Sequence, residues 1–281
     1  MSPRSIIPVG PRSLAVLIAA SVVGLLAFTW PLVVPIEQTG ARAISHSKDA
    51  PWLFVLILPL LAGVVLAQVA EGGMDAKVVA LLGMLTAVIA GLRAISPGTA
   101  GLEPGFFVLL LAGYAFGPGF GFVLGALGMF AGGLITGGIG PWLPFQMFAN
   151  AWVGAFGGLL PGRRRDEPTR LQIGWLALAA LVAGLAYGIV MNMWFWPFAN
   201  FESALTFRPG DDLASNAVRY ARFWVVTSLG WDLPRGIVSA LLVLAFGRPL
   251  LRAFARVSRK AAFGAVGEFE APRGSGTTGT P

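Results

Sequence analysis

Polar side chains recur at helical spacing inside stretches that are otherwise apolar. Gln146 and Asn150 are four residues apart, and Asn192 lies near the end of a later apolar stretch. Asp232 and Arg235 are three residues apart in the last such stretch. Buried amides and charges are costly in hydrocarbon unless they are paired, so they should face a bundle interior or a wet cavity. We expect Asp232 and Arg235 to form a structural ion pair, and the amides to bind either a ligand or a neighbouring helix.

Aromatic residues flank these amides. Tryptophan is common at membrane interfaces, and this accounts for some of them. Aromatic planes beside fixed amides also make a good pocket for a flat, polar, weakly charged organic molecule. The predicted substrate-binding residues are therefore Trp142, Phe145, Gln146, Asn150, Asn192, Trp194 and Trp196.

Other chemistries lack the residues that they need. The chain has no cysteine and a single histidine, His46, which excludes thiolate and multi-histidine metal sites. None of the lysines (Lys48, Lys77 and Lys260) follows a glycine, so there is no P-loop for ATP hydrolysis. A Gly-x-Ser-x-Gly nucleophile motif is absent as well. We expect no catalytic residue, no metal and no cofactor.

Composition indicates which elements hold these side chains. Of the 281 residues, 56% are hydrophobic and only 12% are charged, too few charges for the surface of a soluble protein. Apolar runs of about 17–25 residues can cross a bilayer as helices. The sequence thus predicts an all-α integral membrane protein with eight such segments, at 14–34, 52–70, 77–94, 105–117, 119–136, 143–160, 171–196 and 220–247. Only Gly117-Pro118-Gly119 separates the fourth from the fifth, so 105–136 forms either two spans or one broken helix.

Basic residues indicate how the chain is oriented in the cell membrane. They gather between the sixth and seventh segments and after the eighth, and such clusters mark cytoplasmic loops. The clusters are Arg163, Arg164, Arg165 and Arg170, and then Arg248, Arg252, Arg256, Arg259 and Lys260. Both termini are then cytoplasmic, and residues 264–281 form a disordered tail. The net charge of +7 reflects this topology and contact with lipid, not nucleic-acid binding.

Small residues at helical spacing indicate that helix backbones approach closely. One stripe, which we expect to pack inside the bundle, consists of Gly121, Gly125, Gly128 and Gly132. A second stripe fits either internal packing or the docking of a partner protein, and consists of Gly83, Ala87 and Gly91.

Two glycine-rich runs carry a family resemblance: GYAFGPGFGFVLGALG at 113–128 and GGIGPWLPFQ at 137–146. They resemble the substrate-capture (S) components of energy-coupling factor (ECF) transporters, a class of bacterial vitamin importers. The resemblance covers about residues 77–250 and implies a six-helix S subunit, at 76–250, that binds a vitamin from outside. It implies one membrane T subunit and two ABC ATPases as partners, with the second small-residue stripe contacting the T subunit. Residues 1–75 would be a two-helix extension that the minimal family lacks, and 251–281 a basic, then disordered tail.

The resemblance leaves the substrate open. The sequence is most similar to S components assigned to cobalamin or similarly bulky cofactors, so cobalamin leads, with a thiamine-related pyrimidine or another vitamin as alternatives. His46, in a predicted outer loop, is more simply an ordinary loop residue than a ligand of cobalt. A different hypothesis is a self-sufficient secondary transporter in which Asp232 and Arg235 couple a proton. An intramembrane enzyme is a third.

Overall fold

The computed structural model describes residues 7, 9–33, 50–72, 75–96, 98–161, 167–199, 201 and 204–261, and within these ranges it is helical and contains no strand. The α-helices in the described ranges are α1 (Pro11–Thr29), α2 (Ala50–Ala70), α3 (Ala76–Ile95), α4 (Gly105–Phe116), α5 (Pro118–Thr136), α6 (Leu143–Leu159), α7 (Arg170–Asn192), α8 (Leu213–Phe223) and α9 (Leu229–Ala261). Shorter turns are η1 (Trp30–Leu32), η3 (Thr99–Gly101), η4 (Trp196–Phe198) and the π-helical η5 (Trp224–Ser228). His46, Arg163, Arg164, Arg165 and the tail at 264–281 lie outside the described residues.

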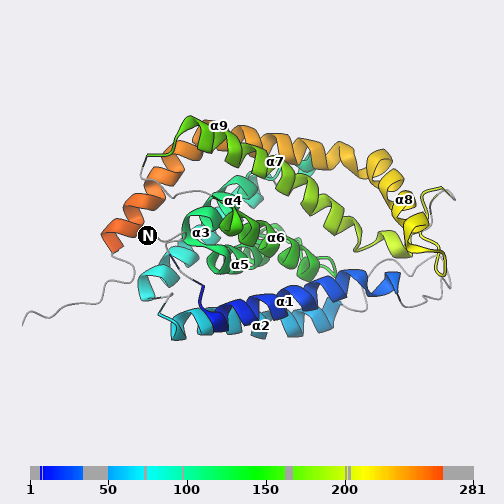
Figure 1. The fold of residues 1–281 in the computed structure, drawn as a ribbon, viewed down its shortest axis with the longest axis horizontal. Helices are drawn as coiled ribbons and strands as arrows, with labels where there is room; N and C mark the ends of the chain where they lie inside the picture. The colour runs from blue at the N-terminus through cyan, green and yellow to red at the C-terminus, as the bar shows by residue number, and fades with distance from the viewer. Residues whose placement is uncertain are drawn as a thin grey trace, which may run out of the picture.

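The helices form a membrane bundle with three levels. Figure 1 shows α1 and α2 along one side, α7 and α9 along the opposite side, and α3 to α6 between them. Within the described residues, the stretches long and apolar enough to cross a membrane are Pro11–Leu32, Pro51–Ala70, Ala76–Ile95, Pro118–Thr136, Arg170–Phe198 and Leu213–Arg259. The prediction of an all-α, multi-pass membrane protein is confirmed.

The predicted spans at 105–117 and 143–160 form helices of fewer than 18 residues. α4 has 12 residues and α6 has 17, so they rise about 18 and 26 Å, whereas the hydrocarbon core measures about 30 Å. α4 is buried along nearly its whole length, because α3, α5, α6 and α9 pack around it. A short helix is tolerated here because other helices, not lipid, surround it.

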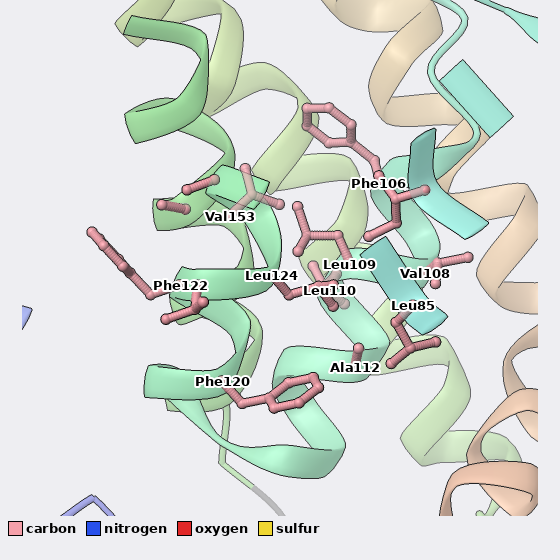
Figure 2. Close-up of a cluster of buried hydrophobic side chains, with 14 of the residues drawn as sticks. Leu85, Phe106, Val108, Leu109, Leu110, Ala112, Phe120, Phe122, Leu124 and Val153 are labelled. Carbon is pink, nitrogen blue, oxygen red and sulfur yellow. The ribbon is translucent and has the colours of Figure 1, made fainter. Parts of the chain in front are cut away.

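The stretch 105–136 forms two helices that turn back on each other. Gly117, between α4 and α5, has a φ of 115°, a conformation that residues with a side chain rarely adopt. Pro118 then begins α5, where its fixed φ suits the first turn. The Phe116 and Phe120 rings are 5.0 Å apart across the turn, and Figure 2 shows Leu109 and Leu124 meeting in the core between the two helices.

Glycines bring α5 against its neighbours. A side-chain carbon on Gly121 or Gly125 would overlap the carbonyl oxygen of Gly154 or Asn150 on α6, so the two backbones are in contact. Gly128 and Gly132 face α3 instead, next to Ile89 and Arg93. The stripe Gly121, Gly125, Gly128 and Gly132 packs inside the bundle, as its spacing predicts.

The N-terminal helix pair is attached to α5 and α6 by specific contacts. Trp152 on α6 donates from its indole nitrogen to the Ser21 hydroxyl at 3.2 Å. Phe28 packs edge-on against Phe145 at 4.9 Å between ring centroids. At the other end, the Glu71 carboxylate accepts the backbone N–H of Arg12 at 2.7 Å and thereby caps α1. The pair therefore belongs to the folded bundle.

Candidate functional site

A cavity of about 310 Å³ opens between α7, η5 and the start of α9. Its largely aromatic wall consists of Tyr187, Phe195, Phe201, Phe223 and Trp231, with Met191. Its polar wall consists of Asn192, Thr227, Ser228, Asp232 and Arg235. Aromatic walls with a few converging polar groups are typical of sites that bind small organic molecules.

A π-helical turn supplies two hydroxyls of this cavity. The turn η5 joins α8 to α9 and carries Thr227 and Ser228. The Thr227 hydroxyl donates to the carbonyl oxygen of Phe223 at 2.7 Å and lies 3.2 Å from the Ser228 hydroxyl. π-helical turns inside longer helices occur often at functional sites. Helical spacing puts Ser228 on the same face as Asp232 and Arg235, but it does not reveal this turn and does not indicate Thr227.

Close packing of α7 on α9 places the charged part of the wall. A side-chain carbon on Gly188 would overlap the Asp232 carboxylate, and one on Gly184 would touch the backbone of Gly236. Because Gly188 has no side chain, Asp232 lies directly against α7. Asn192 is one turn further along α7 and therefore faces the same cavity.

Four charged side chains form a buried network beside the cavity. The Glu103 carboxylate lies 3.0 Å from Arg93 and 3.0 Å from Arg235, and Arg235 also lies 2.6 Å from Asp232. These side chains are between 4% and 12% exposed. The Trp224 indole nitrogen donates to the other Asp232 oxygen at 2.9 Å. With two arginines and two carboxylates, the network carries no net charge.

Arg235 is the centre of this network. Its guanidinium carbon lies 4.9 Å from the centroid of the Tyr187 ring, a cation–π contact. Tyr187 in turn packs edge-on against Phe106 of α4 at 5.0 Å. Asp232 and Arg235 thus form the ion pair that their spacing predicts. Glu103 connects this pair to Arg93 of α3, and Tyr187 connects it to α7 and to Phe106 of α4.

Sequence analysis missed Glu103, Arg93 and Tyr187. Glu103 follows Leu102 and precedes Pro104 in a short connection between two apolar segments. An isolated acidic residue in such a place could have been paired with a nearby basic one, since a buried carboxylate needs a partner. Nothing local indicates that this partner comes from a helix more than a hundred residues later.

Asn192 is the predicted substrate-binding residue that lines the cavity. The residue is 8% exposed, and its buried amide nitrogen has no hydrogen-bond partner among the described residues. Buried polar groups are nearly always bonded, so this amide is an unusual feature of the cavity wall.

Four other predicted residues form a separate polar and aromatic face on α6 and after α7. The Trp142 and Trp194 rings are perpendicular, 6.2 Å apart. Asn150 donates from its amide to the Gln146 carbonyl oxygen at 3.0 Å. The Gln146 side-chain oxygen and the Trp194 indole nitrogen are buried and have no hydrogen-bond partner in the described part of the chain. None of these residues lines the cavity between α7 and α9.

Phe145 and Trp196 do not face the cavity either. Phe145 is fully buried against Phe28 of the N-terminal pair. Trp196 is 1% exposed, donates to the Leu205 carbonyl oxygen at 2.8 Å and packs on Phe207 at 5.4 Å. Both rings contribute to packing because the N-terminal pair and the segment before α8 cover them.

The second small-residue stripe faces outward. Gly83, Ala87 and Gly91 are exposed on α3, and a side-chain carbon on either glycine would meet no atom within 4 Å among the described residues. The stripe is therefore not used for packing within this part of the chain.

A second cavity, of about 200 Å³, lies between α6 and α7. Its walls are apolar apart from Tyr187, with Trp152, Phe156 and Val190 among them. Without converging polar groups it offers a ligand no orientation. Within the described residues there is also no cluster of three or more side chains that could hold a metal ion.

The fold defines a multi-pass membrane protein, and its aromatic, polar cavity has the size of a small-molecule site. The chain belongs to the family described as ECF transporter, substrate-specific component, whose model matches residues 77–246. The match begins at α3, so α1 and α2 lie outside it. No curated protein and no solved structure matches the chain. Membership in this family confirms the resemblance and makes the protein a substrate-specific transport subunit of ECF importers, not an enzyme.

Proposed function

We propose that this chain captures a vitamin or related micronutrient from outside the cell in the cavity between α7, η5 and α9. The observation that carries the proposal is the aromatic wall of this cavity with its converging polar side chains, Asn192 among them. The arginine clusters support an orientation with both termini in the cytoplasm. The end of α7 and the start of α9 are then near the outer surface.

The partners that we propose are a T subunit and two ABC ATPases. Family membership supports an association with such modules, and the chain has no P-loop of its own. The exposed stripe of Gly83, Ala87 and Gly91 supports docking through α3, because small residues let a partner helix approach closely in lipid. Substrate would then pass to the cytoplasm only in the complete assembly.

The face formed by Trp142, Gln146, Asn150 and Trp194 is proposed as a second substrate contact, reached when the ligand enters from outside. Its support is the pair of buried unpaired atoms on Gln146 and Trp194. Phe145 and Trp196 are not included, because each is covered by protein.

Cobalamin is the substrate that the resemblance favours, and smaller vitamins are the alternatives. Proton coupling by Asp232 has less support than a structural role, because its carboxylate forms a buried ion pair with Arg235 and accepts from the Trp224 indole. Protonation would break this buried ion pair.

Native mass spectrometry of the purified chain tests the proposal. We expect a bound small organic molecule. The Asn192→Ala substitution should lower the affinity of the chain for this molecule by about ten- to a hundredfold, because it removes one buried hydrogen bond to the ligand. A molecule that is retained equally by the wild-type chain and by Asn192→Ala would place the substrate elsewhere.

A further inference from the structure

We propose that the cavity between α7, η5 and α9 selects a compact, uncharged, ring-containing solute that accepts hydrogen bonds, and rejects both corrinoids and permanent ions. This inference rests on the proposed function and concerns the substrate class of the same site. It follows from three properties of the cavity: its size, the charge of its wall and the hydrogen-bond donors on its polar side chains.

The size of the cavity limits the ligand. At about 310 Å³ it is at the lower end of the range of about 300–1,000 Å³ typical of small-molecule sites. A corrin ring with its side chains is several times larger than this volume. A ligand of one to three fused rings matches this volume and would lie against the aromatic wall. In that wall the Phe195 and Phe201 rings pack directly on Phe223, at 5.7 and 5.0 Å between ring centroids.

The carboxylates of the charged wall are already balanced by two arginines. Asp232 accepts from Arg235 and from Trp224, one bond on each oxygen. Glu103 accepts from Arg93 on one oxygen and from Arg235 on the other. A cation bound beside this neutral network would leave a net positive charge buried in the membrane, which is costly.

An anionic ligand is disfavoured for the complementary reason. Arg235 already pairs with two carboxylates, and the four-residue network has no net charge. A carboxylate or phosphate placed beside it would leave a net negative charge buried in the membrane. An uncharged ligand keeps the wall neutral.

The polar wall of the cavity offers side chains that can donate hydrogen bonds. The hydroxyls of Thr227 and Ser228 and the amide of Asn192 belong to residues that line it, and each of these groups includes a donor. A ring nitrogen or carbonyl oxygen of the ligand would accept from them. Ring nitrogens and carbonyls of uncharged heteroaromatic compounds have this chemistry.

Matched pairs of probes test the charge requirement directly. One pair is 4-amino-5-hydroxymethyl-2-methylpyrimidine and thiamine, which is the same pyrimidine joined to a cationic thiazolium. The other is riboflavin and riboflavin 5′-phosphate, which differ by an anionic group. Cyanocobalamin tests size. Each is titrated calorimetrically into the full-length chain in lipid nanodiscs.

We expect the uncharged member of at least one pair to bind, its charged partner to bind at least about tenfold more weakly, and cyanocobalamin not to bind. The Asn192→Ala substitution should lower the affinity for the uncharged probe by about ten- to a hundredfold. Gln68→Ala is the matched control: it also removes a buried amide with unpaired atoms, but this amide lies against Gly119 of α5, away from the cavity. It should leave the affinity unchanged.

Tighter binding of the charged members or of cyanocobalamin, or no binding of either uncharged probe, would overturn the proposed substrate class. An equal loss of affinity in Gln68→Ala and Asn192→Ala would also overturn it, because the effect would then not come from the cavity. A different result would overturn the proposed function: accumulation of a solute inside vesicles that contain this chain without any T subunit or ATPase. The two failures are therefore distinguishable.

Discussion

The Glu103 carboxylate and the Arg235 guanidinium lie 3.0 Å apart although 132 residues separate them in the sequence. Glu103 comes from the connection before α4, and Arg235 from the second turn of α9. Their contact ties the first half of the bundle to the last helix and fixes Arg235 at the edge of the cavity. The stability of the bundle and the shape of the site therefore depend on the same pair.

Replacing Glu103 by glutamine should destabilise the protein strongly. Arg93 and Arg235 would then face each other across a buried site with only Asp232 to compensate them, and breaking a buried ion pair costs about 3–5 kcal/mol. Thermal unfolding in detergent measures the effect. The control is Asp211→Asn, which breaks the more exposed pair with Arg219 and should cost no more than about 1 kcal/mol. Equal losses in the two variants would show that Glu103 is not central to the fold.

Gly188→Ala should damage both the fold and the cavity. The new methyl group would overlap the Asp232 carboxylate, and such overpacking typically costs about 1–3 kcal/mol. Gly174→Ala on the same helix is the matched control, because a side-chain carbon there meets no described atom within 4 Å. It should be neutral or slightly stabilising, since alanine favours helix more than glycine does. The melting temperatures of the two variants should therefore move in different directions, and a parallel shift would contradict the packing described for α7 and α9.

Gly83→Leu should weaken assembly with the T subunit and leave the isolated chain intact. Gly83 is exposed and a side chain there has open space, so the melting temperature should not fall. A bulky side chain would nevertheless block close approach of a partner helix. Copurification with a tagged T subunit should drop by about tenfold or more, whereas Gly174→Leu, exposed on α7, should assemble normally. Normal assembly of Gly83→Leu would exclude this face of α3 as the docking surface.

The contact between the start of α1 and the end of α2 should depend on pH. The Ser13 hydroxyl and the backbone N–H groups of Arg12 and Ser13 donate to Glu71 and hold its pKa below the ordinary value of 4.5. Because the folded-state pKa is the lower one, the carboxylate stabilises the fold above about pH 4.5, and this contribution disappears as the pH falls through the folded-state pKa.

Glu71→Gln should therefore melt at a lower temperature than the wild-type chain at neutral pH, and the gap should close as the pH falls through the folded-state pKa of Glu71. The quantity to measure is the difference between the two melting curves, which removes the contribution of all other titrating groups. A gap that stays constant with pH would show that the Glu71 charge does not hold α1.

The helices were predictable because their signals are local. Long apolar runs mark α1, α2, α3, α5 and α7, and the family resemblance in the glycine-rich runs is confirmed by the match over 77–246. The choice between one and two helices at 105–136 depended on the backbone of Gly117, whose positive φ a glycine permits but does not impose.

The site was predictable only in part, because it depends on contacts distant in sequence. Asn192 was identified from its place in an apolar helix, and it lines the cavity. Phe145 has the same local signature, but the N-terminal pair covers it with Phe28. The cavity itself requires the π-helical turn η5, which hydrophobic periodicity does not encode, and a partner for Arg235 from before α4.

Transport in reconstituted vesicles tests the central claim most directly. The full-length chain is reconstituted in proteoliposomes, alone or together with a T subunit and two ABC ATPases. The radiolabelled compound that the chain binds most tightly is then added outside the vesicles. The account predicts that the chain alone binds the probe but does not accumulate it, and that accumulation inside requires the complete assembly and ATP. Concentrative uptake by the chain alone, driven by an ion gradient, would contradict the account.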